Sequence, residues 1–318
     1  MKVDIVNDAL RRIGRFDPEV APVPTVALES SRSLRTSARL AIDADDRAGH
    51  RRQNAHDVVA TDSCLAAHPR LAELIVDGRY GGATEVLLRV GVASGERAVV
   101  AVPSGRRIVV PADVVVGGHA VVHEEVAGAW LQVSIGSFFQ PGPVAAEALV
   151  RSVAAAIGDA LPTGGRLVDA YAGVGLFGAT IGMDSSARVT AIENDPTAVS
   201  DARVNLVGVD AVVFEGEVGR WHPRPGDPPV DVVIADPARS GLGKPGAAAV
   251  IGMAATRVVL VSCDPASLAR DARLLVEGGY VMASVELVDS FPDTFHVETV
   301  TRFDRPSNGG TPAAALGT

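Results

Sequence analysis

The stretch that decides the fold reads "RLVDAYAGVGLFG" and occupies residues 166–178. It begins as a short apolar strand and continues into a turn with the spacing Gly173-x-Gly175-x-x-Gly178, after which a helix is expected. Glycines in such a turn let the backbone bend tightly and approach a bound nucleotide. Glu193 ends the next strand-like run, where a carboxylate can accept hydrogen bonds from two ribose hydroxyls. The pattern predicts a nucleotide site and fits NAD and S-adenosylmethionine alike.

Strand-like and helical segments alternate around this turn. The expected strands are 166–172, 188–194, 211–217, 231–237 and 257–263, with helices such as 196–206 and 265–278 between them. This alternation is typical of a doubly wound α/β fold with a mostly parallel sheet. The last two strands, 280–290 and 298–305, are joined by only seven residues, too few for a parallel crossover. We therefore expect an antiparallel last strand, as in class I S-adenosylmethionine-dependent methyltransferases and unlike an all-parallel nicotinamide domain.

Length and composition indicate a globular protein of two domains. The chain has 318 residues, 47% of them hydrophobic, and a net charge of −9. The negative charge argues against a general nucleic-acid binder. The charged start predicts no signal peptide, no apolar run is long enough to span a membrane, and two cysteines cannot form a disulfide framework. We expect a cytoplasmic protein with reduced thiols.

The pattern changes along the chain, and four parts are expected. They are an N-terminal extension (1–33), a smaller α+β domain (34–140), the domain with the parallel sheet (141–305) and a flexible tail (306–318). Residues 1–110 carry a net charge of +2 and the rest carries −11. A string of arginines in the first part is read as a solvated surface, with a phosphate-contacting face as the alternative. These arginines are Arg32, Arg35, Arg39, Arg47, Arg51 and Arg52.

Cys263 stands where a reactive thiol is expected. It lies in "VLVSCDPASLARD" (259–271), between a β-branched run and an Asp-Pro that begins a helix. A neighbouring helix N-terminus stabilises a thiolate, which is a nucleophile. Asp264 beside it is expected to raise the pKa of the thiol by repulsion between like charges. An isolated cysteine in this position would be interpreted as an inert core residue.

Three C-terminal motifs, taken in order, resemble the RNA uracil-C5 methyltransferase family, which makes 5-methyluridine in tRNA and large-subunit rRNA. They are "DVVIADPARSGLG" (231–243), "VLVSCDPASLARD" (259–271) and "DSFPDTFHVETV" (289–300), and the upstream "FFQ" (138–140) also matches. The resemblance covers about residues 34–304. It implies S-adenosylmethionine as cofactor, RNA as substrate and an RNA-contacting central domain.

The resemblance also implies roles for particular residues. Cys263 is the nucleophile that adds to uracil C6, and Glu298 is the base that removes the C5 proton. Asp236 and Arg239 lie in a loop that contacts the target base, which must be unstacked to enter the site. The residues implied as cofactor contacts are Gln140, Tyr171, Gly173, Gly175, Glu193 and Asp236.

Several positions depart from the family pattern. Asp264 replaces an Asn, and Ala238 replaces the second Pro of an Asp-Pro-Pro-Arg pattern. The chain resembles the family from a point after the N-terminal RNA-binding barrel that many relatives carry. Cys64 matches only the last of the four cysteines that hold an iron–sulfur cluster in some relatives, so we expect no cluster. His119 and His123 fall in a strand-like segment and predict no metal site.

The leading hypothesis is a monomeric RNA 5-methyluridine methyltransferase that uses S-adenosylmethionine. One alternative is a catalytically impaired homologue that binds RNA or cofactor, because the N-terminal barrel is absent and Asp264 adjoins the thiol. The other is an NAD-dependent oxidoreductase built on the glycine turn. The sequence does not identify the RNA or the uridine.

Overall fold

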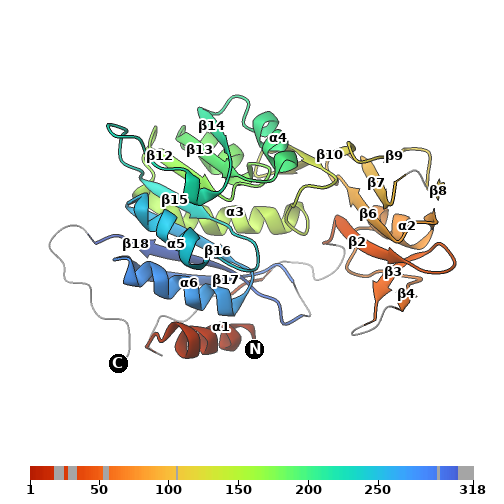
Figure 1. Ribbon diagram of the computed structural model, residues 1–318, viewed down its shortest axis with the longest axis horizontal. Coiled ribbons are helices and arrows are strands. Elements are labelled where there is room, and N and C mark those ends of the chain that lie inside the picture. The colour runs from red at the N-terminus through yellow and green to blue at the C-terminus, as the bar shows by residue number, and fades with distance from the viewer. Residues whose placement is uncertain (18–24, 28–33, 53–56, 105–106, 292–293, 307–318) are drawn as a thin grey trace. The chain divides into compact units, whose positions relative to one another are not determined.

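The computed structural model describes the chain except residues 18–24, 28–33, 53–56, 105–106, 292–293 and 307–318, as drawn in Figure 1. It divides into two compact units. The large unit combines Met1–Leu28 with Glu147–Thr318, and the small unit is Glu29–Ala146. The N-terminal segment therefore joins the large unit, and the boundary falls at residue 147 rather than 141. Nearly all of the predicted tail lies outside the described residues.

An eight-stranded sheet forms the centre of the large unit. Its strands are β1 (Thr25–Ala27), β12 (Arg166–Ala170), β13 (Arg188–Glu193), β14 (Ala211–Glu215), β15 (Val232–Ala235), β16 (Arg257–Ser262), β17 (Val281–Asp289) and β18 (Glu298–Asp304). They are ordered β1-β17-β18-β16-β15-β12-β13-β14. β18 runs antiparallel to both β16 and β17, and the other neighbouring strands are parallel. The predicted mostly parallel sheet with an antiparallel last strand is confirmed.

Burial explains why the central strands are almost purely apolar. Every residue of β15 and β16 is buried, as expected when helices cover both faces of a sheet. The helices of the large unit are α1 (Lys2–Ala9), α3 (Pro143–Ile157, which crosses the unit boundary), α4 (Pro196–Asn205), α5 (Gly243–Gly252) and α6 (Pro265–Glu277). Short 3-10 and π segments are η1 (Leu10–Gly14), η2 (Gly158–Ala160), η3 (Gly178–Gly182) and η4 (Val218–Arg220).

Two helices of the large unit begin with the same local signal. Asp195 caps α4 by accepting hydrogen bonds from the backbone N–H groups of Thr197 and Ala198, both at 2.9 Å. Asp264 caps α6 by accepting from the N–H of Ser267 at 2.8 Å. Each cap is followed by proline at the first helical position, which suits the helix start. The caps fix where the chain turns from a strand end into a helix.

The N-terminal segment belongs to the core of the large unit. Val6, Leu10 and Phe16 are buried in the same apolar cluster as the residues of α5 and α6. α1 lies beside α6 in Figure 1, and a Cβ on Gly14 would come within 3.1 Å of the Ala269 carbonyl oxygen. The segment expected to be an extension is therefore an integral layer of this unit.

The small unit is an α+β arrangement, as predicted. Its six-stranded sheet has the order β4-β3-β2-β6-β7-β9, and β5-β8 and β10-β11 form two further pairs. The strands are β2 (Ser37–Ile42), β3 (Ala48–Arg51), β4 (Val58–Ala60), β5 (Arg79–Gly81), β6 (Glu85–Val90), β7 (Arg97–Val102), β8 (Arg107–Val109), β9 (Val114–Val116), β10 (Val121–Val126) and β11 (Ala129–Ser134). α2 (Pro69–Val76) supplies Leu71 and Leu74 to the core, against which the free thiol of Cys64 packs.

The strands β3, β4, β5 and β9 have only three or four residues each, which is too few to show the alternation by which a strand is recognised in a sequence. In the described part of the chain no helix is long and apolar enough to cross a membrane.

Candidate active site

The polar residues of the candidate site follow the ends of neighbouring parallel strands. Tyr171, Glu193, Asp236 and Cys263 come at or directly after the carboxyl ends of β12, β13, β15 and β16. Because these strands are parallel, their carboxyl ends lie at one edge of the sheet, where open α/β sheets bind ligands. The fold thus brings together residues that are up to 92 positions apart in the sequence.

The glycine turn has the backbone that a close ligand approach requires. Gly173 and Gly175 adopt left-handed φ angles of 55° and 87°, and a Cβ on Gly173 would point into open space. The Glu193 carboxylate accepts a hydrogen bond from the Gly173 N–H at 2.8 Å through Oε2. Its Oε1 accepts from the N–H groups of Asn194 and Asp195 at 2.7 and 2.8 Å. These bonds tie the end of β13 to the turn and orient the carboxylate beside it.

Asp169 is a buried acceptor beneath this turn. Its Oδ2 accepts from the Gly178 N–H at 3.3 Å, whereas its Oδ1 has no hydrogen-bond partner among the described residues. Burial, reinforced by the charges of Asp236 and Glu193, raises the pKa of Asp169 to about 8. Sequence analysis assigned Asp169 no role. An aspartate in an otherwise apolar, buried strand is unusual, and this could have pointed to a role for Asp169.

Tyr171 and Gln140, two further predicted cofactor contacts, belong to different units. Tyr171 is half-buried, and a Cβ on Gly246 would lie 2.6 Å from its hydroxyl oxygen, so the phenol lies against α5. Burial is the main cause that raises the pKa of Tyr171. Gln140 belongs to the small unit, where it is buried. Its role as a cofactor contact stays a prediction.

Strand register brings Cys263 and Glu298 together. In the antiparallel pairing of β16 with β18, Val261 is opposite Val300 and Ser262 is opposite Thr299. One further step of the register puts Cys263 opposite Glu298, and directly opposed residues have Cα atoms about 4.5–5.5 Å apart and side chains on the same face. Cys263 is half-buried and Glu298 is 4% exposed. The two predicted catalytic residues are therefore neighbours.

Burial and neighbouring charges set the pKa values of Cys263 and Glu298. Burial raises the pKa of its thiol, the charge of Glu298 raises it further, and the hydrogen-bonded guanidinium of Arg239 opposes both. Burial, with the charge of Asp236, raises the pKa of Glu298 well above its ordinary value. Burial likewise raises the pKa of Asp236 to about 7. The expectation that the helix N-terminus favours the thiolate stays a prediction; burial and the nearby carboxylates act in the opposite direction on the pKa of the thiol.

Asp264 has a different role from the one expected. Its carboxylate is directed at the N–H of Ser267 as the cap of α6, and the charges that raise the pKa of Cys263 belong to Glu298 and Asp236. Asn and Asp are about equally good at this position of a helix. The exchange of Asn for Asp in the motif therefore preserves the cap.

The loop after Asp236 is held by two residues of α6 that sequence analysis did not single out. The carboxylate of Asp271, completely buried, accepts from the N–H groups of Leu242 at 2.6 Å and Gly243 at 3.1 Å. Arg270 donates to the Ser240 carbonyl oxygen at 2.5 Å. This bracing positions the exposed Arg239 at Cys263. Both residues belong to the Ala-Arg-Asp that ends the cysteine motif, and that part of the motif could have pointed to them.

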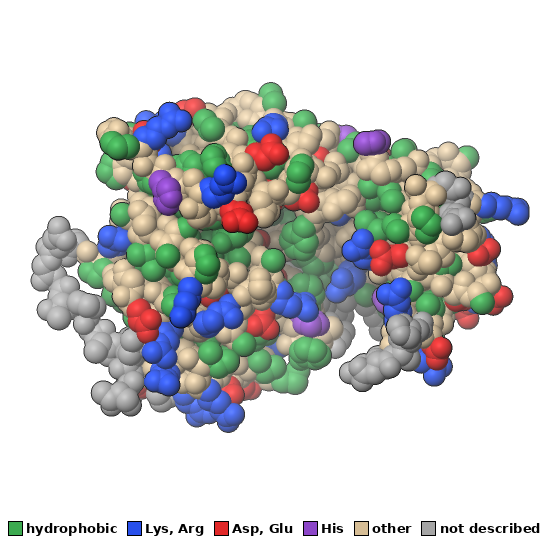
Figure 2. All heavy atoms as spheres, viewed as in Figure 1, with side chains coloured by type: hydrophobic (Ala, Val, Ile, Leu, Met, Phe, Trp, Pro, Cys, Tyr) green, Lys and Arg blue, Asp and Glu red, His purple; other side chains and the backbone are tan. Residues whose placement is uncertain are grey.

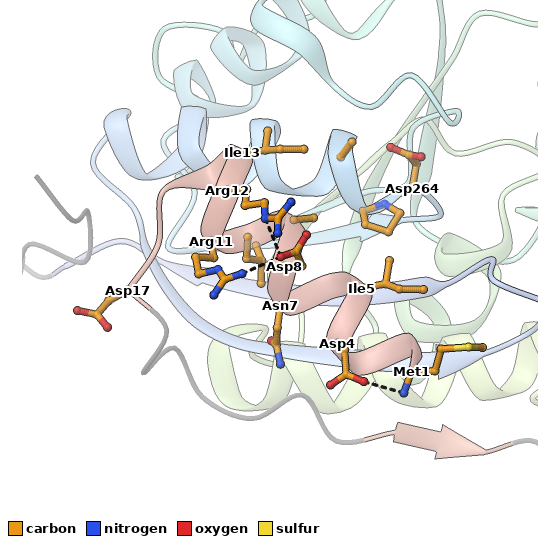
Figure 3. Close-up of a pocket in the computed structure, with 14 residues that line it drawn as sticks. Met1, Asp4, Ile5, Asn7, Asp8, Arg11, Arg12, Ile13, Asp17 and Asp264 are labelled. Carbon is orange, nitrogen blue, oxygen red and sulfur yellow. Dashed lines mark hydrogen bonds and ion pairs between the residues drawn. The ribbon is translucent and has the colours of Figure 1, made fainter.

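A separate hollow of about 990 Å³ lies against α1 and η1 and is bordered by Asp264–Ala266 (Figure 3). Asp8 pairs there with Arg11 at 2.8 Å and with Arg12 at 2.9 Å. Lys and Arg side chains gather over α1 and α6 at the lower left of Figure 2. Because the arginines that line the hollow pair with a carboxylate beside them, we place the reaction at the strand ends instead.

Comparisons with known proteins show which proteins the chain resembles. The chain is 32% identical to an uncharacterized RNA methyltransferase of Streptomyces avermitilis over 97% of its own length and 78% of the relative's. A homologue with the same description from Corynebacterium glutamicum is 30% identical, with 96% and 76% covered. A crystal structure of Pyrococcus abyssi tRNA (uracil-54, C5)-methyltransferase in complex with S-adenosyl-L-homocysteine superposes with a TM-score of 0.73 at 22% identity, covering 95% of this chain and 82% of that one. No family model matches the chain.

The fold and the strand-end site define a class I S-adenosylmethionine-dependent methyltransferase. The chain belongs to the RNA methyltransferase family represented by these relatives. The NAD alternative is therefore set aside. The site also fits S-adenosylmethionine chemically, because Glu193 and Asp236 at the strand ends offer oxygen acceptors to a cofactor with hydroxyl and ammonium donors.

Proposed function

We propose that the protein methylates uridine at C5 in RNA. The observation that carries the proposal is the register of β16 with β18. Its last pair is Ser262 with Thr299, and one step further Cys263 falls opposite Glu298, at the edge that also holds the glycine turn. A nucleophile and a base on adjacent strands, next to a methyl donor site, are the groups that methylation of a weakly nucleophilic ring carbon requires.

Cys263 activates the ring. Its thiolate adds to uracil C6, which converts the C5=C6 double bond into an enolate with electron density at C5. Arg239, hydrogen-bonded to the sulfur, stabilises the thiolate against the desolvation and the Glu298 charge that disfavour it. When bound, S-adenosylmethionine supplies an electrophilic methyl group. The residues of the large unit proposed to hold the cofactor are Tyr171, Gly173, Gly175, Glu193 and Asp236.

Glu298 completes the reaction. Once C5 carries both a hydrogen and the methyl group, the carboxylate takes the C5 proton, the C5=C6 bond reforms, and the C6–S bond breaks to release the Cys263 thiolate. The raised pKa of Glu298 suits this step, because a carboxylate with a high pKa is a stronger base than an ordinary one. The product is 5-methyluridine, with the proton on Glu298.

The test is tritium release from RNA labelled at uridine C5, with and without S-adenosylmethionine, for wild type and Cys263→Ala. The substrates are unmodified tRNA and large-subunit rRNA transcripts, so the responding transcript identifies the RNA class. Release that needs both the cofactor and Cys263 supports the proposal. No release by a protein that binds the cofactor would contradict it and favour the impaired homologue.

Glu298→Gln separates the two chemical steps. Adduct formation and methylation need Cys263, but elimination needs the base, so this variant should accumulate RNA covalently bound through Cys263. The complex is detected as a denaturation-resistant, labelled band on a gel. The double variant Cys263→Ala/Glu298→Gln is the control and should give no band.

A further inference from the structure

We propose that the ring of Phe295 is a stacking platform for a base next to the uridine that enters the site. The inference rests on the proposed function and deepens it by identifying a contact to the RNA strand. Phe295 lies between β17 and β18, three residues before Glu298, and its side chain is 70% exposed. An aromatic ring so close to the catalytic pair and so open to solvent is available to a ligand.

Phe295 is part of a cluster of three rings. It packs on His296 with ring centroids 4.5 Å apart and an interplanar angle of 39°. His296 in turn meets Phe291 edge to face, with centroids 5.9 Å apart and an angle of 67°. We call Phe291, Phe295 and His296 the aromatic cluster. One side of the Phe295 ring is supported by protein, which leaves the rest for a base.

Hydrogen bonds brace the chain that carries the aromatic cluster. The Thr294 hydroxyl donates to the Phe291 carbonyl oxygen at 2.7 Å and accepts from the His296 N–H at 3.2 Å. Lys2 of α1 donates to the same carbonyl oxygen at 2.7 Å and pairs with Asp289 at 2.5 Å. A braced ring loses little conformational freedom when it binds, which favours affinity.

Phe295 is close enough to the proposed catalytic residues to contact a base next to the extruded uridine. Three residues of extended chain span at most about 10 Å, so the Cα atom of Phe295 lies within that distance of the Cα atom of Glu298. A uridine that leaves the stack to reach Cys263 exposes the faces of its neighbours. Aromatic side chains stack on such unpaired bases in many RNA-binding proteins. Phe295 would replace the lost stacking partner and hold the strand while the uridine reacts.

Fluorescence of 2-aminopurine tests the platform directly. The probe is a single-stranded RNA with one central uridine flanked on both sides by 2-aminopurine, bound to the full chain with S-adenosylhomocysteine. Wild type and Phe295→Tyr should quench the probe. Phe295→Ala and the apolar but non-aromatic Phe295→Leu should lose that quenching and bind the RNA roughly 5- to 150-fold more weakly. Unchanged S-adenosylhomocysteine affinity of each variant shows that the site is folded.

Quenching and affinity equal to wild type in Phe295→Ala would overturn the platform. So would recovery of both by Phe295→Leu, because apolar burial would then suffice. Failure of the platform and failure of the proposed reaction give different results. If Phe295→Ala loses the quenching but the wild type releases no tritium, the platform stands and uridine methylation is contradicted. If the wild type releases tritium but Phe295→Ala quenches and binds the RNA like the wild type, uridine methylation stands and the platform is contradicted.

Discussion

At the scale of the residue, Cys263 is set between opposing influences. Burial and the Glu298 charge raise the pKa of the thiol, and the Arg239 guanidinium lowers it. The thiol is therefore the favoured form in the resting site, and neighbouring groups decide how readily it ionises. Asp264, the nearest charge in sequence, is turned to the α6 backbone instead.

The reactivity of Cys263 should respond to these neighbours with opposite signs. Glu298→Gln removes a negative charge and should move the midpoint of the iodoacetamide rate profile to lower pH. Arg239→Met removes the counter-charge and should move the midpoint to higher pH. The experiment is thiol alkylation over a pH series, read by mass spectrometry at Cys263. Arg273→Met, which removes a guanidinium paired with Glu277 on α6, is the control and should leave the midpoint in place.

Asp169 should make the protein without cofactor less stable as pH rises. Its pKa is about 8 in the folded state against an ordinary 3.8, so the folded state binds the proton more tightly than the unfolded chain. That contribution is complete below about pH 4 and is lost as pH rises through 8. Asp169→Asn should therefore raise the Tm relative to wild type at pH 8 and bring little gain at pH 4.5.

Differential scanning calorimetry at the two pH values provides this comparison. Asp227→Asn is the control of opposite sign, because the Arg224 N–H lowers the pKa of Asp227 and its charge favours the folded state above its unfolded pKa. An equal gain from Asp169→Asn at both pH values would contradict the assignment.

At the scale of the element, the junction from β16 to α6 concentrates three roles in a few residues. The strand end carries the proposed nucleophile, Asp264 caps the helix, and Asp271, about two turns further along, holds the loop that carries Arg239. Since α6 holds both the residue after Cys263 and the loop that carries Arg239, the position of its first turn affects both side chains.

Asp264→Ala should destabilise the protein by about 0.5–2 kcal/mol, because the N–H of Ser267 loses its partner, and Asp264→Asn should restore most of that stability. Urea unfolding measures the difference. Asp195→Ala removes the matching cap of α4 and should cost a similar amount. At saturating S-adenosylmethionine only Asp264→Ala should also lower the rate of methyl transfer, since α6 follows the proposed nucleophile Cys263 whereas α4 follows the proposed cofactor contact Glu193. Equal rate losses in both variants would argue against a special role for the α6 start.

At the scale of the whole molecule, the first helix is part of the large unit although most of that unit lies after residue 146. α1 and η1 pack on α6, and Lys2 reaches the chain before Glu298. The N-terminal segment thus contributes to the same layer that carries the site.

Leu10→Ala should therefore destabilise the large unit by about 2–5 kcal/mol, the range for deleting a buried leucine side chain. Ile13→Ala, in the same π segment but 43% exposed, is the matched control and should be nearly neutral. Urea unfolding followed by Trp221 fluorescence reports on this unit in a Trp130→Phe background. If Leu10→Ala has the same free energy of unfolding as the wild type, the segment is dispensable for the core.

The sequence by itself determined the local elements and the chemistry-bearing residues. Apolar alternation, glycine spacing and Asp-Pro helix starts depend on neighbours a few residues apart, so the strands around 166–178 and the helices after Asp195 and Asp264 were predictable. The short connection before Glu298 also predicted the antiparallel last strand. The cysteine motif identified Cys263 without any knowledge of its surroundings.

Only the tertiary structure decided what those residues meet. The register that sets Glu298 opposite Cys263, the burial that raises both of their pKa values and the packing of residues 2–16 on α6 all depend on segments far apart in the chain. Pairing and desolvation are properties of the assembled core, and no local pattern encodes them. For that reason the sequence could place a candidate nucleophile at a strand end but could not show that burial and Glu298 raise the pKa of its thiol.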